Sequence, residues 1–136
     1  MSLPAPLQGE ILLVDDDAAF RSVYLSLLRH QGYRVDQADD RPTARAAMTK
    51  IAYAVVLLDL MLPPDGTTRG GLEQLRALLA LRPESKVIVV SGAGDTQAML
   101  QAIKEGAHDF LTKPADPDVL LTVVQRALQR FKLEQQ

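Results

Sequence analysis

Charged side chains follow three short apolar runs of this 136-residue chain. In chain order they are Asp15–Asp17 after Glu10–Val14, Asp59 after Ala54–Leu58, and Lys113 after His108–Thr112. If the runs are parallel strands of one sheet, their carboxyl ends open on the same edge, where open α/β sheets bind ligands. Crowded carboxylates repel one another, and a few hard oxygen ligands suit a divalent cation such as Mg²⁺. The pattern therefore predicts a magnesium site with a lysine beside it.

The segments that must position these side chains alternate between strand-like and helix-like patterns. Apolar runs predict strands at residues 10–14, 33–38, 54–58, 86–90 and 108–112. Helical spacing of apolar residues predicts five helices, one after each strand. An aspartate precedes four of these helices and is expected to cap them: Asp17, Asp40, Asp95 and Asp116. A loop of Leu60–Gly70 precedes the third helix. This alternation predicts an α/β fold: a doubly wound parallel sheet with helices on both faces and right-handed crossovers.

Composition limits the classes of function. The chain is 47% apolar and 24% charged, which is typical of one globular domain. The formal net charge is −2, and no basic cluster precedes the last helix, so we expect no direct nucleic-acid contact by this segment. The chain has no cysteine, which excludes disulfides and thiolate chemistry and is compatible with the cytoplasm. No apolar run is long enough to span a membrane, and residues 1–8 are expected to form a flexible arm or leader.

The order of these residues resembles the receiver domain of two-component response regulators, the CheY-like superfamily. The resemblance rests on five elements: Asp15–Asp16, Asp59, Ser91 after an apolar run, Gly106–Ala107 ahead of Phe110, and Lys113–Pro114. Each element is short and common by chance, but all five occur in order at the ends of predicted strands. The resemblance covers residues 10–131 and implies a receiver domain at 9–131. It also implies a flavodoxin-like sheet of five strands in the order 2-1-3-4-5.

The resemblance assigns a role to each residue of the acidic edge. Asp59 is expected to accept a phosphoryl group from a sensor histidine kinase in a phosphorelay. Asp16 and Asp59 are expected to ligate Mg²⁺ directly, Asp15 through water, and Met61 through its backbone carbonyl. Lys113 is expected to pair with Asp59 at rest and with the phosphoryl oxygens afterwards. It is also expected to precede a cis peptide bond.

A conformational switch is implied as well. Ser91 is expected to bond a phosphoryl oxygen, and Phe110 to rotate into the vacated space, which changes the face formed by residues 95–105, 108–112 and 116–131. Taken alone, Phe110 is better interpreted as a core aromatic and Asp15–Asp17 as a solvated turn with a helix cap, whereas Ser91 is equally well interpreted as a turn residue. The combination with Asp59 and Lys113 favours the metal and phosphoacceptor interpretation.

Two departures from the family pattern carry their own expectations. The segment Pro63–Gly71 is about four residues longer than in most receivers, because the glycine that usually follows the acceptor aspartate comes later here. Such loops tolerate insertions and often carry partner specificity. Met61 and Ala93 occupy the positions that tune loss of the phosphoryl group in this family. Neither side chain positions an attacking water well, so slow autodephosphorylation is expected.

The C-terminal residues keep helical propensity past the expected end of the last helix. Residues 132–136 are therefore interpreted as the start of a helical linker to an output domain outside this chain. Together with the Pro63–Gly66 loop, this is similar to receivers of NtrC-like, enhancer-binding transcription regulators. Homodimerisation is open, either through the switching face or through a coiled seam of the last helix that buries Leu128 and Phe131.

Two other functions stay in view. One is a receiver that acts as a protein-interaction module without phosphorylation, which the full set of acidic, serine and lysine residues disfavours. The other is an enzyme, either flavin-dependent or a Mg²⁺-dependent phosphohydrolase. The first run ends in acids instead of a phosphate-binding glycine loop, and Met61 stands where a hydrolase would place a second acid. We therefore expect no enzyme, but a regulatory domain that assists its own phosphorylation and dephosphorylation.

Overall fold

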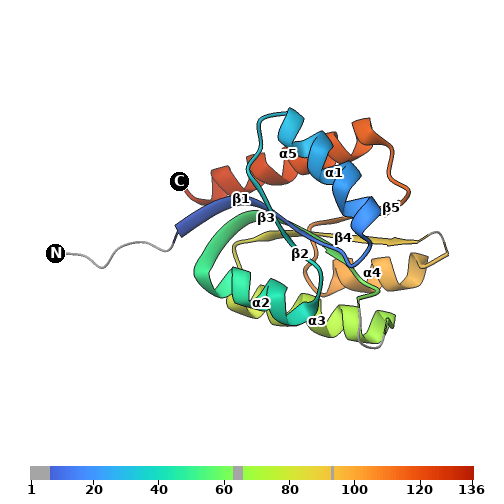
Figure 1. The fold of residues 1–136 in the computed structure, drawn as a ribbon. Coiled ribbons are helices and arrows are strands. Elements are labelled where there is room, and N and C mark those ends of the chain that lie inside the picture. Colours follow the sequence, from blue (N-terminus) through green and yellow to red (C-terminus); the bar gives the residue numbers. More distant parts are fainter. Residues whose placement is uncertain (1–6, 63–65, 93) are drawn as a thin grey trace.

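The structure is a computed structural model that describes residues 7–62, 66–92 and 94–136. Five strands and five helices alternate along the described chain (Figure 1). They are β1 (Leu7–Val14), α1 (Ala18–His30), β2 (Val35–Ala38), α2 (Arg41–Lys50), β3 (Ile51–Asp59), α3 (Thr68–Leu81), β4 (Lys86–Gly92), α4 (Thr96–Lys104), β5 (Asp109–Lys113) and α5 (Pro117–Glu134). The strands are all parallel and lie in the order β2-β1-β3-β4-β5. The predicted fold class and strand order are confirmed.

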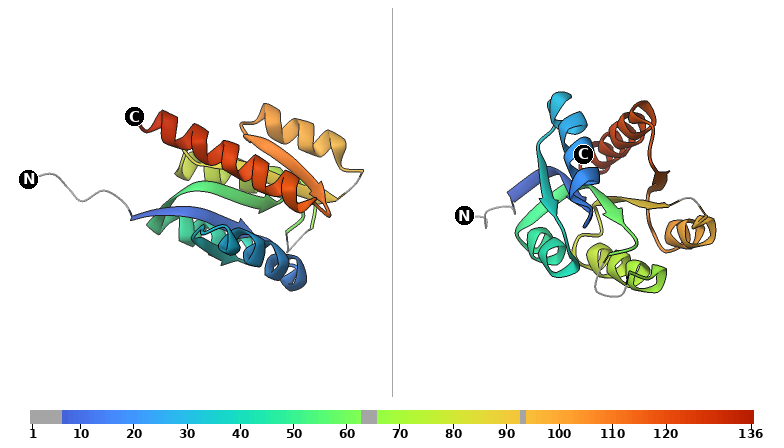
Figure 2. Two further views of the ribbon diagram at one scale, coloured as in Figure 1. Left: turned by 90° about the horizontal axis from the view of Figure 1, so that it is seen from above. Right: turned by 45° about the vertical axis from the view of Figure 1, so that its right-hand side comes forward.

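The sheet separates two hydrophobic cores. Helices α1 and α5 cover one face, and α2, α3 and α4 cover the other (Figures 1 and 2). Residues of β3 alternate between the two cores: Val55 and Leu57 face α1 and α5, whereas Val56 and Leu58 face the opposite layer. Because both faces are covered, the central strand is apolar at nearly every position. The continuous apolar run at residues 54–58 predicted this burial.

β1 is longer than the sequence indicated. It begins at Leu7, and Leu7 and Gln8 pair in parallel register with Ile51 and Ala52. These two residues therefore belong to the sheet, although the flexible arm was expected to continue to residue 8. The pairing extends β1 because β3 also begins earlier than predicted, at Ile51. Residues 1–6 lie outside the described part of the chain.

Aspartate caps three helices as predicted. The side chains of Asp17, Asp40 and Asp116 accept hydrogen bonds from backbone N–H groups in the first turns of α1, α2 and α5. α3 has an unexpected cap, Thr67, whose hydroxyl accepts from the N–H of Gly70 at 3.2 Å. The loop before α3 is therefore shorter than the predicted Leu60–Gly70, because both glycines of the Gly70–Gly71 pair lie within the helix.

α5 is buried along one side up to its last turn. Leu128 and Phe131 are 6% and 8% exposed because they pack against the α1 and α5 face of the sheet. The suggestion that these two residues form a coiled seam with a second chain is wrong. The last turn is tied to the start of β4 by an ion pair between Lys86 and Glu134. Neither α5 nor any other helix in the described part of the chain is long and apolar enough to cross a membrane.

Candidate functional site

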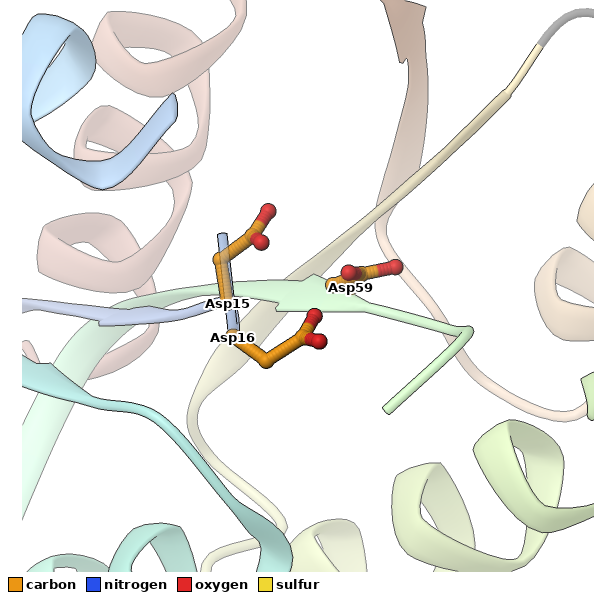
Figure 3. Close-up of side chains that lie close together, drawn as sticks. All are labelled: Asp15, Asp16 and Asp59. Atoms are coloured by element: carbon orange, nitrogen blue, oxygen red, sulfur yellow. The ribbon is translucent and has the colours of Figure 1, made fainter. Parts of the chain in front are cut away.

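Three carboxylates converge at the carboxyl ends of β1 and β3. Asp15 and Asp16 directly follow β1 and Asp59 ends β3, so the parallel neighbours β1 and β3 bring them to one edge (Figure 3). Each residue offers a carboxylate oxygen, and these oxygens all lie within 4.8 Å of one another. Asp15 and Asp59 are 1% and 4% exposed, whereas Asp16 is exposed to solvent. The predicted acidic cluster is confirmed, with its open side at Asp16.

Backbone groups hold one oxygen of each buried carboxylate. The N–H of Asp17 donates to Oδ1 of Asp15 at 2.9 Å, and the N–H of Met61 donates to Oδ1 of Asp59 at 2.9 Å. Both bonds connect residues two apart, so the turns after β1 and β3 orient the carboxylates locally. The bond from the N–H of Asp17 favours the ionised form of Asp15. The remaining oxygens are left for charged partners.

Lys113 lies between the two buried carboxylates. Its Nζ is 2.7 Å from Oδ2 of Asp15 and 3.3 Å from Oδ2 of Asp59. The expected pairing with Asp59 is confirmed, and the closer contact with Asp15 was not predicted. Burial by itself would lower the pKa of Lys113, but the two carboxylates raise it above its ordinary value. The ammonium therefore stays charged at neutral pH and offsets part of the negative charge of the cluster.

The donor set fits a hard divalent cation. Burial raises the pKa of Asp15, and Lys113 opposes this only in part. Oδ2 of Asp15 is buried and makes no hydrogen bond among the described residues, its partner being the charge of Lys113. Such an oxygen, next to the exposed Asp16, is what a hydrated Mg²⁺ would satisfy, since Mg²⁺ prefers carboxylate oxygens and retains water.

Ser91 lies near the end of β4, beside β3, and is 1% exposed. Its hydroxyl donates a hydrogen bond to Oδ2 of Asp95 at 2.6 Å. Asp95 occupies the N-cap position of α4 as predicted, but its side chain makes no capping hydrogen bond. The reason is competition, because a side chain that bonds the buried hydroxyl of Ser91 is turned away from the N–H groups of α4.

Phe110 lies on the outer strand β5 and is 37% exposed. The alternative interpretation of this residue as a core aromatic is therefore wrong for this conformation. Leu111, its neighbour in the strand, is the residue that enters the core, at 4% exposed. Phe110 is therefore exposed in this structure, and its inward rotation stays a prediction.

Aromatic residues of α1 complete the surroundings of Lys113, and sequence reasoning missed their role. Nζ of Lys113 lies 4.3 Å from the ring centroid of Phe20. The hydroxyl of Tyr24 bonds the backbone of Ala115, just after the Lys113–Pro114 peptide bond, which is cis as expected. Helical spacing places both aromatics on the apolar side of α1 and does not indicate a contact with Lys113. The one available signal was the tyrosine hydroxyl, which requires a partner when buried.

Comparison with known proteins agrees with this geometry. The family model described as the response regulator receiver domain matches residues 11–125. The C4-dicarboxylate transport transcriptional regulatory protein DctD of Pseudomonas aeruginosa is 36% identical to this chain. The aligned region covers 96% of this chain and 27% of DctD. The chain therefore spans about a quarter of the length of this regulator.

Two crystal structures illustrate the fold. The receiver domain of NtrX from Brucella abortus is 34% identical, with a TM-score of 0.81 over 88% of this chain and 98% of that one. A response regulator from Burkholderia pseudomallei, with a phosphorylated aspartic acid, a calcium ion and citrate, is 27% identical, with a TM-score of 0.76 over 93% and 72% of the chains. Five parallel strands, a convergent acidic edge and a family match over most of its length agree: this chain belongs to the response regulator receiver domain family.

Proposed function

We propose that this receiver accepts a phosphoryl group on Asp59 from a sensor histidine kinase, with Mg²⁺, and passes the signal to an output domain. The observation that carries the proposal is the buried carboxylate of Asp59 at the open acidic edge, 3.3 Å from the ammonium of Lys113. The phosphorylated aspartic acid and calcium ion in the related Burkholderia pseudomallei structure support it.

The chemistry is a transfer between two nucleophiles. A carboxylate oxygen of Asp59 forms a bond to phosphorus while the bond between phosphorus and the donor's imidazole nitrogen breaks, and the imidazole leaves with its electron pair. Positioning and electrostatics supply most of the catalysis of such a transfer. Lys113 offers its ammonium to the phosphoryl oxygens, since it already lies beside Asp59 and Asp15. Asp16, Asp59, Asp15 through water and the carbonyl of Met61 would hold Mg²⁺, which neutralises charge on the transferring group.

The switch follows from a competition for one hydroxyl. Ser91 donates to Asp95 at rest, and a phosphoryl group on Asp59 adds strong acceptor oxygens at the end of the neighbouring strand. When Ser91 exchanges partners, Asp95 is released at the start of α4, and the exposed Phe110 can turn inward. Phosphorylation therefore acts on the face of α4, β5 and α5.

Asp95→Asn is expected to favour the switched state. An amide oxygen is a weaker acceptor than a carboxylate, by about 1 kcal/mol, so the population should shift roughly fivefold. The measurement is the ¹⁹F resonance of fluorinated Phe110 across a titration of beryllofluoride, a phosphoryl mimic. In a Ser91→Ala background the same substitution should have no effect. An equal shift with and without the hydroxyl of Ser91 would exclude the competition.

The phosphorylated state is expected to be long-lived. Met61 follows Asp59 by two residues and is 38% exposed, and its thioether cannot orient a water toward the phosphorus as an acidic or amide side chain would. Ala93, the other position that tunes this reaction, lies outside the described residues. Decay of the intact mass of the phosphorylated protein in Mg²⁺ measures the lifetime, and Met61→Asn should shorten it. A lifetime of only seconds in the unchanged chain would contradict this prediction.

One assay separates the proposed function from its alternatives. The chain is incubated with Mg²⁺ and acetyl phosphate, and the acyl phosphate is located by reduction and peptide mapping. We expect a stable adduct on Asp59 that forms with Mg²⁺ and does not form when EDTA is present during the incubation. An interaction module that works without phosphorylation would not label, and a phosphohydrolase would release phosphate continuously without a stable adduct. Either result would remove the proposal.

The partners belong to the same proposal. The transcriptional role of relatives such as DctD supports an output domain that controls transcription in the cytoplasm, with residues 132–136 leading toward it. Exposed apolar side chains occur on all three elements of the α4, β5 and α5 face: Leu100 and Ile103 on α4, Phe110 on β5 and Val119 on α5. This face is the surface we propose for contact with the output domain or a second copy. Solution mass with and without beryllofluoride distinguishes these two partners.

A further inference from the structure

Lys113 reaches the candidate site through a flexible side chain. Holding its ammonium in one place costs rotamer freedom, so contacts must enforce the position. Two of these contacts are the carboxylates of Asp15 and Asp59, at 2.7 Å and 3.3 Å from Nζ. Both change their surroundings when Mg²⁺ and a phosphoryl group arrive. The carboxylates alone therefore do not keep the ammonium in place throughout the reaction.

Helix α1 supplies a contact that does not depend on the state of Asp59. The ring of Phe20 lies under the ammonium of Lys113, with its centroid 4.3 Å from Nζ. An ammonium at this distance is attracted by the negative face of the ring. The side chain of Lys113 is 24% exposed, so the contact is partly shielded from water. The ring keeps the ammonium from turning outward into solvent.

The next turn of α1 holds the backbone beyond Lys113. The hydroxyl of Tyr24 donates to the carbonyl of Ala115 at 2.9 Å and accepts from the N–H of Ala115 at 2.8 Å. Tyr24 is 5% exposed, and its ring centroid lies 4.1 Å from that of Phe20 at an interplanar angle of 43°. One aromatic pair on α1 therefore contacts both the ammonium of Lys113 and the backbone two residues later.

We propose that Phe20 and Tyr24 are positioning residues for Lys113, which hold its ammonium at the acceptor edge through contacts other than those with the carboxylates. Phe20 acts on the side chain through its ring, and Tyr24 acts on the loop between β5 and α5 through its hydroxyl. The inference rests on the proposed role of Asp59 as acceptor. It goes beyond that role because it assigns control of Lys113 to a helix that does not itself supply a reacting group.

The first test is the initial rate of Asp59 labelling by acetyl phosphate in Mg²⁺. Phe20→Leu keeps a large apolar side chain but removes the ring, and we expect labelling to slow about 3- to 10-fold. Phe20→Tyr keeps the ring and should label at the unchanged rate. Tyr24→Phe keeps the contact between the two rings, removes both hydrogen bonds to Ala115 and should slow labelling to a smaller extent.

The second test is spectroscopic and independent of labelling. The ring current of Phe20 shifts the Hε resonances of Lys113, which are assigned by their loss in Lys113→Arg. We expect these resonances to move toward those of a solvated lysine in Phe20→Leu and to stay in place in Phe20→Tyr. Leu25→Ala is the matched stability control, since Leu25 is on the same helix and packs against the same core.

Each outcome has one meaning. Equal rates in Phe20→Leu and the unchanged chain, or equal slowing in Phe20→Leu, Phe20→Tyr and Leu25→Ala, would overturn the positioning role. Failure of the unchanged chain to label would overturn the proposed function instead. In that case the Lys113 resonances still decide whether Phe20 holds the ammonium.

Discussion

Asp59→Asn is expected to abolish phosphorylation by acetyl phosphate or by a kinase. Asparagine has almost the same shape as aspartate, but its neutral amide cannot act as the attacking carboxylate. The change also removes one of three clustered negative charges while Lys113 keeps its closer partner, Asp15 at 2.7 Å. We therefore expect the free energy of unfolding without Mg²⁺ to be unchanged or slightly higher.

The measurements are intact mass after reaction and urea unfolding with and without Mg²⁺. A cation that binds only the folded state raises the free energy of unfolding, and the variant with fewer ligands should gain less from it. Asp17→Asn is the matched control, because it removes a charge from the same edge while asparagine still caps α1. Undiminished labelling of Asp59→Asn, or an equal loss in Asp17→Asn, would show that the acceptor is not Asp59.

Gly71→Ala is expected to destabilise the fold strongly, although it adds only one methyl group. Gly71 lies in the first turn of α3 and faces the backbone of Leu60, directly after Asp59. A Cβ atom at Gly71 would lie 2.0 Å from the carbonyl oxygen of Leu60 and 2.7 Å from its carbon. The end of β3 and the start of α3 cannot move apart without displacing each other's neighbours. We therefore expect the free energy of unfolding to fall by about 3 kcal/mol or more.

Helix propensity alone predicts the opposite sign. Alanine in place of a helical glycine normally stabilises by about 1 kcal/mol, so a lower urea midpoint in Gly71→Ala can come only from the close approach. Gly92→Ala is the control, since its Cβ would meet only Oδ2 of Asp95 at an ordinary 3.7 Å. The displaced chain adjoins Asp59, so labelling of any folded Gly71→Ala should also slow. A midpoint equal to that of the unchanged chain would refute the steric argument.

The sequence determined the architecture and the membership of the acidic site. Continuous apolar runs at residues 54–58 and 86–90 specify strands buried on both faces, and the alternation with helices specifies parallel pairing. Parallel strands share one carboxyl edge, so Asp15, Asp16 and Asp59 had to converge once the strands were placed. The helix caps at Asp17, Asp40 and Asp116 could also be predicted from the sequence, because a capping side chain bonds the backbone of the residues that directly follow it.

The tertiary structure decided which distant groups meet. The hydroxyl of Ser91 binds Asp95 instead of leaving it to cap α4, and Lys113 lies closer to Asp15 than to Asp59. Phe20 is positioned under the ammonium of Lys113 only because α1 packs against the loop after β5. Periodicity indicates which side of an element is buried, but it does not give the rotamers and separations of side chains far apart in the chain. These follow from how the helices pack on the sheet, and they determine the arrangement of charged groups at the acidic edge.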